Sequence, residues 1–306
     1  MQRSHLQDMK KQLLISLCLL LALPSLSEAQ HLRARWKAYR YEYNFGLGVT
    51  NFLGELGGAN QIGTHGFKDL EFKETRPAVV LGFRYKVAPS LAFNTHLSYG
   101  QVRGDDKLTT EYFRNRRNLN FKSNIFEFNL NMEASLLSQR EGGIYRLRGV
   151  HRSSSFEASL YGFVGIGIFH FNPKGQLNGH WYELQPLGTE GQDIDPARKK
   201  YKRTQLCIPI GIGGRYFFNR RWGAGFEFGV RQTFTDYIDD VSKTYYDIAA
   251  LKQKNGPTSA ILSDKSVTGM NAGDQRGDPG HNDSYIFAVF SLHYKLRTGR
   301  TNFPIF

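Results

Sequence analysis

The sequence predicts an all-β protein, an up-and-down antiparallel transmembrane β-barrel of about eight strands with short periplasmic turns and long extracellular loops. Three observations predict this fold. Eight segments alternate apolar with polar residues at a period of two, short and long connections alternate along the chain, and the polar positions hold small residues and ions of both signs. No stretch sustains the helical period of about 3.6 residues, so a helical fold is not expected.

The composition suits curved β structure. The 306 residues include 32 Gly, 23 Phe and 16 Tyr, and many glycines with many aromatics are more typical of strands with bends than of helices. Lys and Arg number 40 against 27 Asp and Glu, a net charge of +13. The start of the chain, described next, indicates an exported protein, and an exported protein rarely meets nucleic acid. We therefore expect anionic outer-membrane lipid, lipopolysaccharide or an acidic protein as partners, and no nucleic acid.

We expect residues 1–29 to be a secretory signal peptide. A basic start precedes an apolar run from Leu13 to Leu23, and small residues stand just before a cleavage site after Ala29. The run is too short to cross a bilayer as a helix. The barrel domain is therefore predicted over 30–306, and Cys207 is its single cysteine, so no internal disulfide is expected to close it.

The first three predicted strands, 38–53, 78–87 and 90–103, each separate an apolar face from a polar one. Successive side chains of a strand point to opposite faces, so alternate residues share one side of the sheet. The polar faces of these strands include Arg40, Glu42, Asn44, Arg84, Lys86, Asn94, His96 and Ser98.

The fourth predicted strand, 124–137, shows the alternation clearly. One face holds Phe126, Phe128, Leu130, Met132, Ala134 and Leu136. The opposite face holds Ile125, Glu127, Asn129, Asn131 and Glu133. The last four predicted strands span 155–171, 203–218, 221–236 and 284–297.

The connections between predicted strands differ in length in a regular way. Residues 88–90 and 219–220 form tight turns, and 138–154 form a medium link. The long polar connections are 54–77, 104–121, 172–202 and 237–283. This alternation indicates a meander whose two ends face different compartments. The loop 237–283 is the best candidate for mobility, because its second part is rich in Lys, Asn, Gly, Ser, Asp and Pro.

The polar face decides between a soluble lipocalin-like barrel and an outer-membrane barrel. Eight strands leave an interior just wide enough for side chains, so ions there must pair. A narrow lumen also favours small residues, and this face is rich in Gly. We therefore predict that the apolar face meets lipid, that no open diffusion channel exists, and that an ion network fills the lumen. Its predicted members are Arg40, Glu42, Arg84, Glu127, Glu133, Arg215, Glu227 and Arg231.

Aromatic residues near the strand ends support the membrane interpretation, since aromatic girdles mark both interfaces of membrane barrels. The residues concerned are Tyr39, Tyr41, Tyr85, Tyr99, Trp222, Phe234 and Tyr294. The chain also ends in Phe306, a common last residue of barrels inserted into the bacterial outer membrane. The cell outer membrane is therefore the expected location.

Candidate chemistry is sparse. His96 and Ser98 lie two apart on one strand, as in some lipid-modifying barrel enzymes, but the alternation places both in the lumen, away from lipid. The acidic loops 193–196, 236–240 and 273–283 lack an ordered ligand spacing for a cation. We therefore predict no catalytic, cofactor-binding or metal residues. Two basic clusters, "RNRR" and "RKKYKR", remain candidates for lipopolysaccharide phosphates, and a merely solvated loop is an equal alternative.

Three passages resemble a known family: "RNRRNLNFKSNIFEFNLNMEASLL", "YGFVGIGIFHFNPKGQLNGHWYELQPLGTEGQ" and "CIPIGIGGRYFFNRRWGAGFEFGVRQTFTDYIDDVSKTYYD". They are similar to the PorG-like outer-membrane barrels of Bacteroidetes. The family motif residues present here include Trp181, Tyr182, Glu183, Gln185, Asp236, Tyr237, Asp239, Asp240, Tyr245 and Tyr246. The resemblance covers nearly all of the chain after the signal.

The resemblance implies a non-enzymatic component of the type IX secretion system, with no cofactor. The family's best-known member is thought to tether a periplasmic ring of the PorK lipoprotein and PorN at the outer membrane. For this chain we expect an anchor or scaffold of that kind. A lipid-modifying enzyme and an adhesion or ligand-binding barrel, acting through its extracellular loops, remain the alternatives.

One connection is a candidate contact with such a partner. The segment 140–155, "REGGIYRLRGVHRSSS", is long and basic for a periplasmic turn. We expect Arg146, Arg148 and Arg152 to contact an acidic patch of a periplasmic protein.

Overall fold

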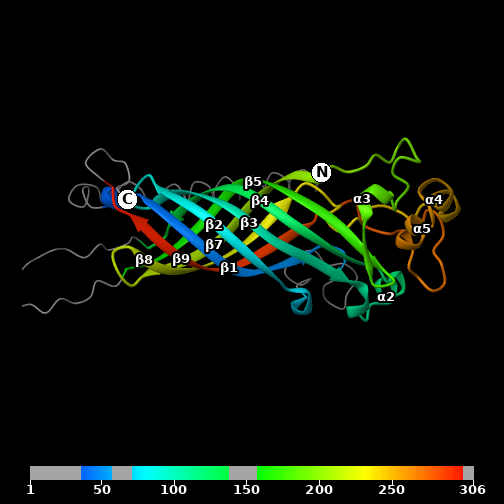
Figure 1. The fold of residues 1–306 in the computed structure, drawn as a ribbon, viewed down its shortest axis with the longest axis horizontal. Coiled ribbons are helices and arrows are strands. Elements are labelled where there is room, and N and C mark those ends of the chain that lie inside the picture. The colour runs from blue at the N-terminus through cyan, green and yellow to red at the C-terminus, as the bar shows by residue number, and fades with distance from the viewer. Residues whose placement is uncertain (1–35, 57–70, 138–156, 299–306) are drawn as a thin grey trace, which may run out of the picture.

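The computed structural model describes residues 36–56, 71–137 and 157–298 (Figure 1). The predicted signal peptide, and Arg146, Arg148 and Arg152 of the predicted periplasmic contact, lie outside the described residues. None of the helices within the described ranges has the length and apolar character to cross a membrane.

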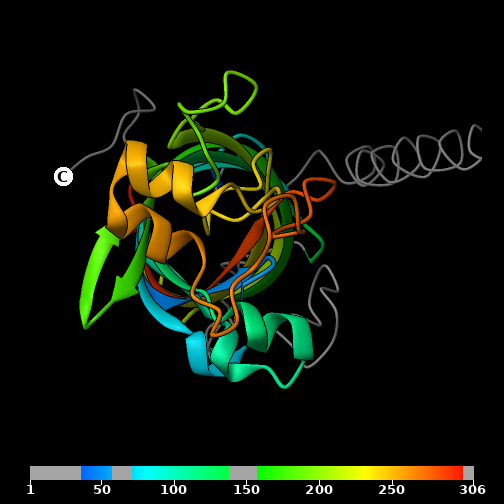
Figure 2. The same ribbon diagram turned by 90° about the vertical axis from the view of Figure 1, so that its right-hand side faces the viewer.

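Eight antiparallel strands form a closed barrel, which confirms the predicted fold class. They are β1 (Tyr41–Leu53), β2 (Arg76–Lys86), β3 (Leu91–Asp105), β4 (Asn120–Ser135), β5 (Glu157–Leu177), β7 (Thr204–Phe217), β8 (Trp222–Thr233) and β9 (Ser284–Leu296). Each of these eight strands pairs with the next one in the barrel, and β9 pairs with β1 to close the ring. Figure 2 looks along the bore.

The fifth strand is longer than predicted. The sequence places its end at residue 171 and the following stretch in a loop, but β5 continues to Leu177 and pairs with an extra short strand, β6 (His180–Glu183). The two strands join through Asn178 and Gly179, whose φ angles are 50° and 81°. Two consecutive positive φ angles define the type I′ turn of tight hairpins, which favours the sequence Asn-Gly. The correction is local, since β6 lies beyond the barrel wall.

The two ends of the barrel differ. One end, which we call the turn end, carries the tight connections β2–β3 and β7–β8. The other end, which we call the cap end, carries the helices (Figures 1 and 2). These are α2 (Tyr112–Arg117), α3 (Leu184–Leu187), α4 (Ile248–Asn255) and α5 (Pro257–Ser263). Single-turn 3-10 helices span Trp36–Tyr39, Phe72–Glu74 and Asp106–Leu108.

The strands present an apolar outside and a buried inside, as the alternation predicts. Along β4, Phe126 and Phe128 are 55% and 53% exposed, whereas Glu127 is 1% exposed. No soluble fold would leave a continuous band of Phe, Leu and Ile exposed around its whole wall while burying its ions. The band has the character of a lipid-facing surface.

The inside has two layers. Towards the turn end the lumen is polar and ionic, whereas the cap half holds a hydrophobic core that includes Ile125, Phe169, Phe171 and Phe287. Glycines on the lumen side allow large side chains to cross the bore. At Gly213, for example, an added Cβ would lie 2.3 Å from the ring of Tyr161. The sequence does not predict the apolar layer.

A charge placed on the outer wall is expected to destabilise the barrel. Leu130 lies midway along the apolar face of β4, so Leu130→Arg should cost about 2–4 kcal/mol of the free energy of unfolding in lipid vesicles. Phe113→Arg is the matched control, because Phe113 is exposed on α2 at the cap end. Urea unfolding of both variants checks the prediction. Equal stability of the two would contradict a lipid-facing wall.

Candidate functional site

Four predicted lumen ions form one cluster near the turn end, contributed by four different strands. The Glu133 carboxylate lies 2.7 Å from Nε of Arg84 and also contacts Arg215. Glu42 lies 3.4 Å from Arg84 and 3.8 Å from Arg215. His293, which is not among the predicted members of the network, lies 2.7 Å from Glu42 through Nδ1. We call these five residues the turn-side ion cluster.

Three of the other four predicted lumen ions lie closer to the cap end, whereas Arg40 lies at the turn end. Arg231 contacts Glu127 at 3.3 Å, and the hydroxyl of Tyr285 donates to Glu127 at 2.7 Å. Glu227 accepts from the hydroxyl of Tyr161 at 3.2 Å. Arg40 lies just before β1, and its guanidinium donates to the hydroxyl of Tyr85 at 3.3 Å. The structure thus divides the predicted network into separate groups.

His96 and Ser98 both point into the lumen and are at most 4% exposed. Nδ1 of His96 lies 3.4 Å from the side-chain nitrogen of Asn131 and 3.9 Å from Glu227. Neither side chain reaches the lipid-facing wall, so this pair has no route to an acyl chain in the described structure. The arrangement fills and neutralises the bore.

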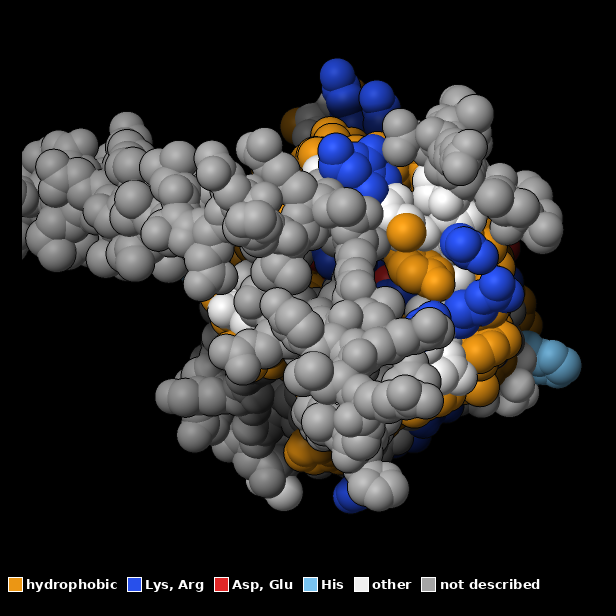
Figure 3. Space-filling model, turned by 90° about the vertical axis from the view of Figure 1, so that its left-hand side faces the viewer, with side chains coloured by type: hydrophobic (Ala, Val, Ile, Leu, Met, Phe, Trp, Pro, Cys, Tyr) orange, Lys and Arg blue, Asp and Glu red, His pale blue; other side chains and the backbone are white. Residues whose placement is uncertain are grey.

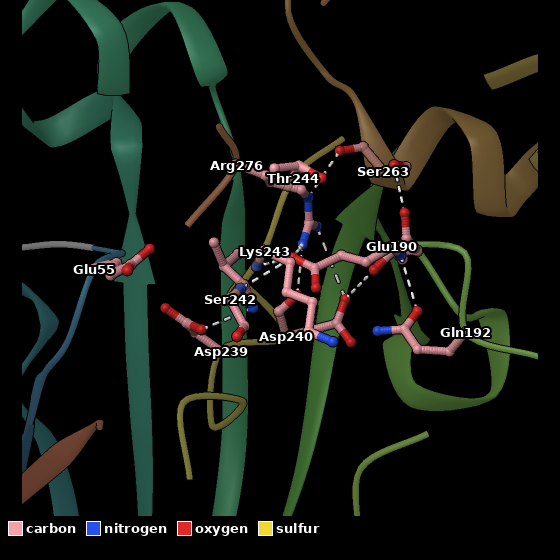
Figure 4. Close-up of polar contacts among 12 residues, drawn as sticks. Glu55, Glu190, Gln192, Asp239, Asp240, Ser242, Lys243, Thr244, Ser263 and Arg276 are labelled. Atoms are coloured by element: carbon pink, nitrogen blue, oxygen red, sulfur yellow. Dashed lines mark hydrogen bonds and ion pairs between the residues drawn. The ribbon is translucent and has the colours of Figure 1, made fainter. Parts of the chain in front are cut away.

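The long connections at the cap end fold over the mouth of the barrel. We call residues 184–203 and 235–283 together the outer cap. Arg276 lies at its centre (Figure 4). Its Nη1 atom lies 2.9 Å from Glu190 and also donates to the backbone carbonyl of Asp240, while its Nε donates to the carbonyl of Ser263 at 3.2 Å. One guanidinium therefore ties three segments of the cap together.

Two of the three passages that carry the family resemblance meet in this cap. Glu190, from the second passage, accepts hydrogen bonds from the backbone N–H groups of Ser242 and Lys243, from the third, at 2.9 and 3.1 Å. Thr189 and Tyr201 both donate to the carboxylate of Asp240, the latter at 2.6 Å. The motif has a structural explanation, because its polar residues form hydrogen bonds with one another inside the cap.

The other motif residues also lie at the cap end. Tyr237 stacks on Tyr201 with ring centroids 4.6 Å apart, and Tyr245 is 1% exposed. Gln185 donates to the carbonyl of Tyr201 at 3.1 Å. Tyr246 lies beneath the guanidinium of Arg198, 5.3 Å away. The remaining motif residues are Trp181, Tyr182 and Glu183 on β6 and Asp236 and Asp239 after β8.

Several carboxylates within the cap and directly beneath it are buried near one another. Burial raises the pKa of Glu55 to about 7, against the opposing effect of Arg117. Burial, and then the neighbouring Asp239, raise the pKa of Asp236 to about 9. Burial also raises the pKa of Asp240 to about 6, although Arg276 opposes the shift. Across the described ranges, no group of three or more His, Cys, Asp or Glu residues is arranged to hold a metal ion.

These shifts predict that the cap is more stable in mild acid. In the unfolded cap the carboxyls titrate near pH 4. Between about pH 4 and pH 7 the folded cap therefore binds more protons than the unfolded cap, so its stability falls as the pH rises through the raised pKa values of Asp240 and Glu55. Hydrogen exchange, corrected for intrinsic rates, should show more protection of the cap at pH 5 than at pH 8. Glu55→Gln should flatten this dependence, and greater protection at pH 8 would contradict it.

The cap and the lumen side chains leave little space along the axis. A cavity beneath the cap, lined among others by Leu56, Leu119 and Arg276, measures about 10 Å³, roughly the room of one water molecule. A larger recess of about 300 Å³ lies on the outer wall instead, beside Lys122 and Trp181.

Comparisons with known proteins identify a family and a group of similar barrels. The family model described as "Domain of unknown function (DUF6089)" matches residues 42–258. None of the curated proteins matches the chain. Among solved structures, the attachment invasion locus protein Ail of Yersinia pestis is 9% identical with a TM-score of 0.34, covering 84% of this chain and 99% of that one. The outer membrane protein OprG of Pseudomonas aeruginosa is 10% identical with a TM-score of 0.34, covering 86% and 99%. Neisserial surface protein A is 7% identical with a TM-score of 0.33, covering 83% and 96%.

Proposed function

Because the chain belongs to the family described as Domain of unknown function (DUF6089), which carries no assigned activity, we propose a function from its structure: a non-enzymatic barrel of the bacterial outer membrane that anchors other proteins at its rims. The lumen supports this proposal most directly. Five strands contribute side chains to the turn-side ion cluster, so the bore is crossed by contacts rather than open. A barrel of eight strands has no space for both these side chains and a passage.

The turn end is proposed as the docking surface. In membrane barrels the short turns face the periplasm. Lys37, Arg220, Arg221 and Arg297 are exposed at this end, and Figure 3 shows Lys and Arg side chains gathered along its uncovered rim. An acidic periplasmic protein is the complementary partner, since opposite charge speeds association and fixes orientation.

The specific partner we propose is a ring of the PorK and PorN type, within a type IX secretion system. The sequence resemblance to PorG-like barrels supports this choice, and the basic turn end suits it. The expected contact of Arg146, Arg148 and Arg152 with an acidic periplasmic protein belongs to the same proposal. In this proposal the barrel holds the ring at the membrane and cargo passes elsewhere.

Crosslinking in intact cells tests the proposal. We expect periplasmic proteins to crosslink to the barrel, and the double variant Arg220→Glu, Arg297→Glu to lose them. The matched control is Lys252→Glu with Lys254→Glu on α4, which changes the same charge at the cap end. Deleting the gene should also remove exported cargo from the culture supernatant. Normal export, with lost attachment of cells to surfaces, would contradict the secretion role and support adhesion.

A further inference from the structure

The outer wall above the apolar band carries three in-register rows on β3, β4 and β5. The row nearest the band is aromatic, with Tyr99 opposite Phe126 and Phe126 opposite His170. The next row towards the cap end is neutral and polar, with Gln101, Asn124 and Asn172 in line.

The third row is basic. Arg103 lies opposite Lys122, and Lys122 lies opposite Lys174. Like charges directly opposite on neighbouring strands destabilise a sheet, so three adjacent cations call for a compensating anion. They share one face of the wall, pointing outwards rather than into the lumen.

The carboxylates nearest to the basic row each already form ion pairs with two cations. Glu74 lies 2.9 Å from Arg76 and 3.5 Å from Arg103. Glu183, opposite Lys174 on β6, lies 3.4 Å from both Lys174 and Arg203. The row beyond holds Asp105 opposite Asn120, and Lys265 donates to Asn120 at 2.8 Å. Of the described carboxylates, none lies within ion-pair distance of Lys122, which is the central cation of the basic row.

A recess opens at this place. It measures about 300 Å³ and its lining includes Lys122, Lys174, His170, Phe126 and Trp181. The ring of Trp181, from β6, lies 4.2 Å from Nζ of Lys122 and 5.3 Å from the guanidinium carbon of Arg103. Such cation–π contacts hold the two cations beside the recess. The recess therefore has an aromatic edge at Phe126, a neutral polar middle of Gln101, Asn124 and Asn172, and a cationic edge towards the cap end.

We propose that this recess binds the phosphate group of an anionic lipid in the outer leaflet, with Lys122 and Lys174 as the charged contacts. Two lysines and an adjacent imidazole supply several N–H donors to a phosphate. The phosphate belongs to a lipid rather than to a soluble ion because the recess opens sideways above the apolar band. Acyl chains attached to the bound headgroup would lie along Phe126 and Phe128. This inference concerns the wall and does not depend on docking at the turn end.

Native mass spectrometry of the detergent-solubilised full chain tests the proposal, with bis-phosphorylated lipid A as the probe. Lys122→Gln with Lys174→Gln should weaken retention of this lipid by about tenfold or more, because both charge-assisted contacts to the phosphate are lost. The control is Lys252→Gln with Lys254→Gln, the same charge change on α4. Lys122→Arg should retain binding, because it keeps the cation.

Two further binding measurements identify the ligand. Dephosphorylated lipid A should bind the wild type and the Lys122→Gln, Lys174→Gln variant equally weakly. Inorganic phosphate at the same concentration should not displace the bis-phosphorylated lipid. Equal retention of that lipid by the lysine and control variants would overturn the site. Displacement by inorganic phosphate would overturn the lipid as its ligand. Heat-dependent gel mobility confirms that each variant is folded before binding is measured.

Discussion

Glu133→Ala is expected to lower the free energy of unfolding of the barrel by about 3–5 kcal/mol, the cost of leaving buried cations without a partner. Glu133 contacts both Arg84 and Arg215 and accepts from Asn94 at 2.7 Å. All of these side chains are at most 5% exposed, so water cannot replace the lost carboxylate. Urea unfolding in lipid vesicles, followed by gel mobility, measures the loss.

The control for this prediction is an exposed ion pair. Lys200 lies 2.5 Å from Asp193 on the surface of the cap, and Lys200→Ala should cost less than about 1 kcal/mol. Combining Glu133→Ala with Arg215→Met should cost less than the sum of the single variants, because the second substitution removes one of the unpaired cations. A Glu133→Ala barrel as stable as the Lys200→Ala barrel would show that the lumen ions do not stabilise the fold.

Arg276→Met is expected to release the outer cap while leaving the barrel folded. The substitution removes the contacts to Glu190, Asp240 and Ser263 together. It leaves the two buried carboxylates, those of Glu190 and Asp240, without their cation, at a cost of about 3–5 kcal/mol of cap stability. Hydrogen exchange should therefore rise sharply in residues 184–203 and 235–283. Exchange in the strands should not change, since Arg276 belongs to a connection and not to the wall.

The matched control is Arg116→Met. Arg116 also lies at the cap end, but its contacts are the exposed side chain of Thr268, at 3.0 Å, and the carbonyl of Gly269. We expect a small change in exchange there. Unchanged protection of the cap in Arg276→Met would mean that other contacts hold it closed.

The barrel wall was predictable because its physics is local. Along β4, alternation alone separates Phe128 from Glu127, and the structure places them on opposite faces. The same pattern placed Glu42, Arg84 and Arg215 in the lumen. Which of these ions form pairs depends on strand register and tilt. Alternation with a period of two residues contains no information on either.

The cap was not predictable in the same way. Residues 237–283 are expected from their composition to be a polar loop and the best candidate for mobility, yet the structure folds them into α4, α5 and a network around Arg276. Its contacts join residues as far apart as Glu190 and Arg276, and no local pattern reveals such pairs. The hydrophobic core of Phe169 and Phe171 was missed for a related reason, because apolar residues on both faces of a strand hide the alternation.

The central claim is that lipid surrounds the apolar face of each strand while side chains fill the bore. A nitroxide scan of residues 126–132 in lipid vesicles, on a Cys207→Ala background, tests it most directly, because Cys207 is the single buried free cysteine of the described chain. We expect labels at 126, 128, 130 and 132 to be accessible to oxygen dissolved in the bilayer and shielded from a water-soluble quencher. A protein that stays soluble without detergent, with labels at 126 and 128 shielded from both quenchers, would contradict the account.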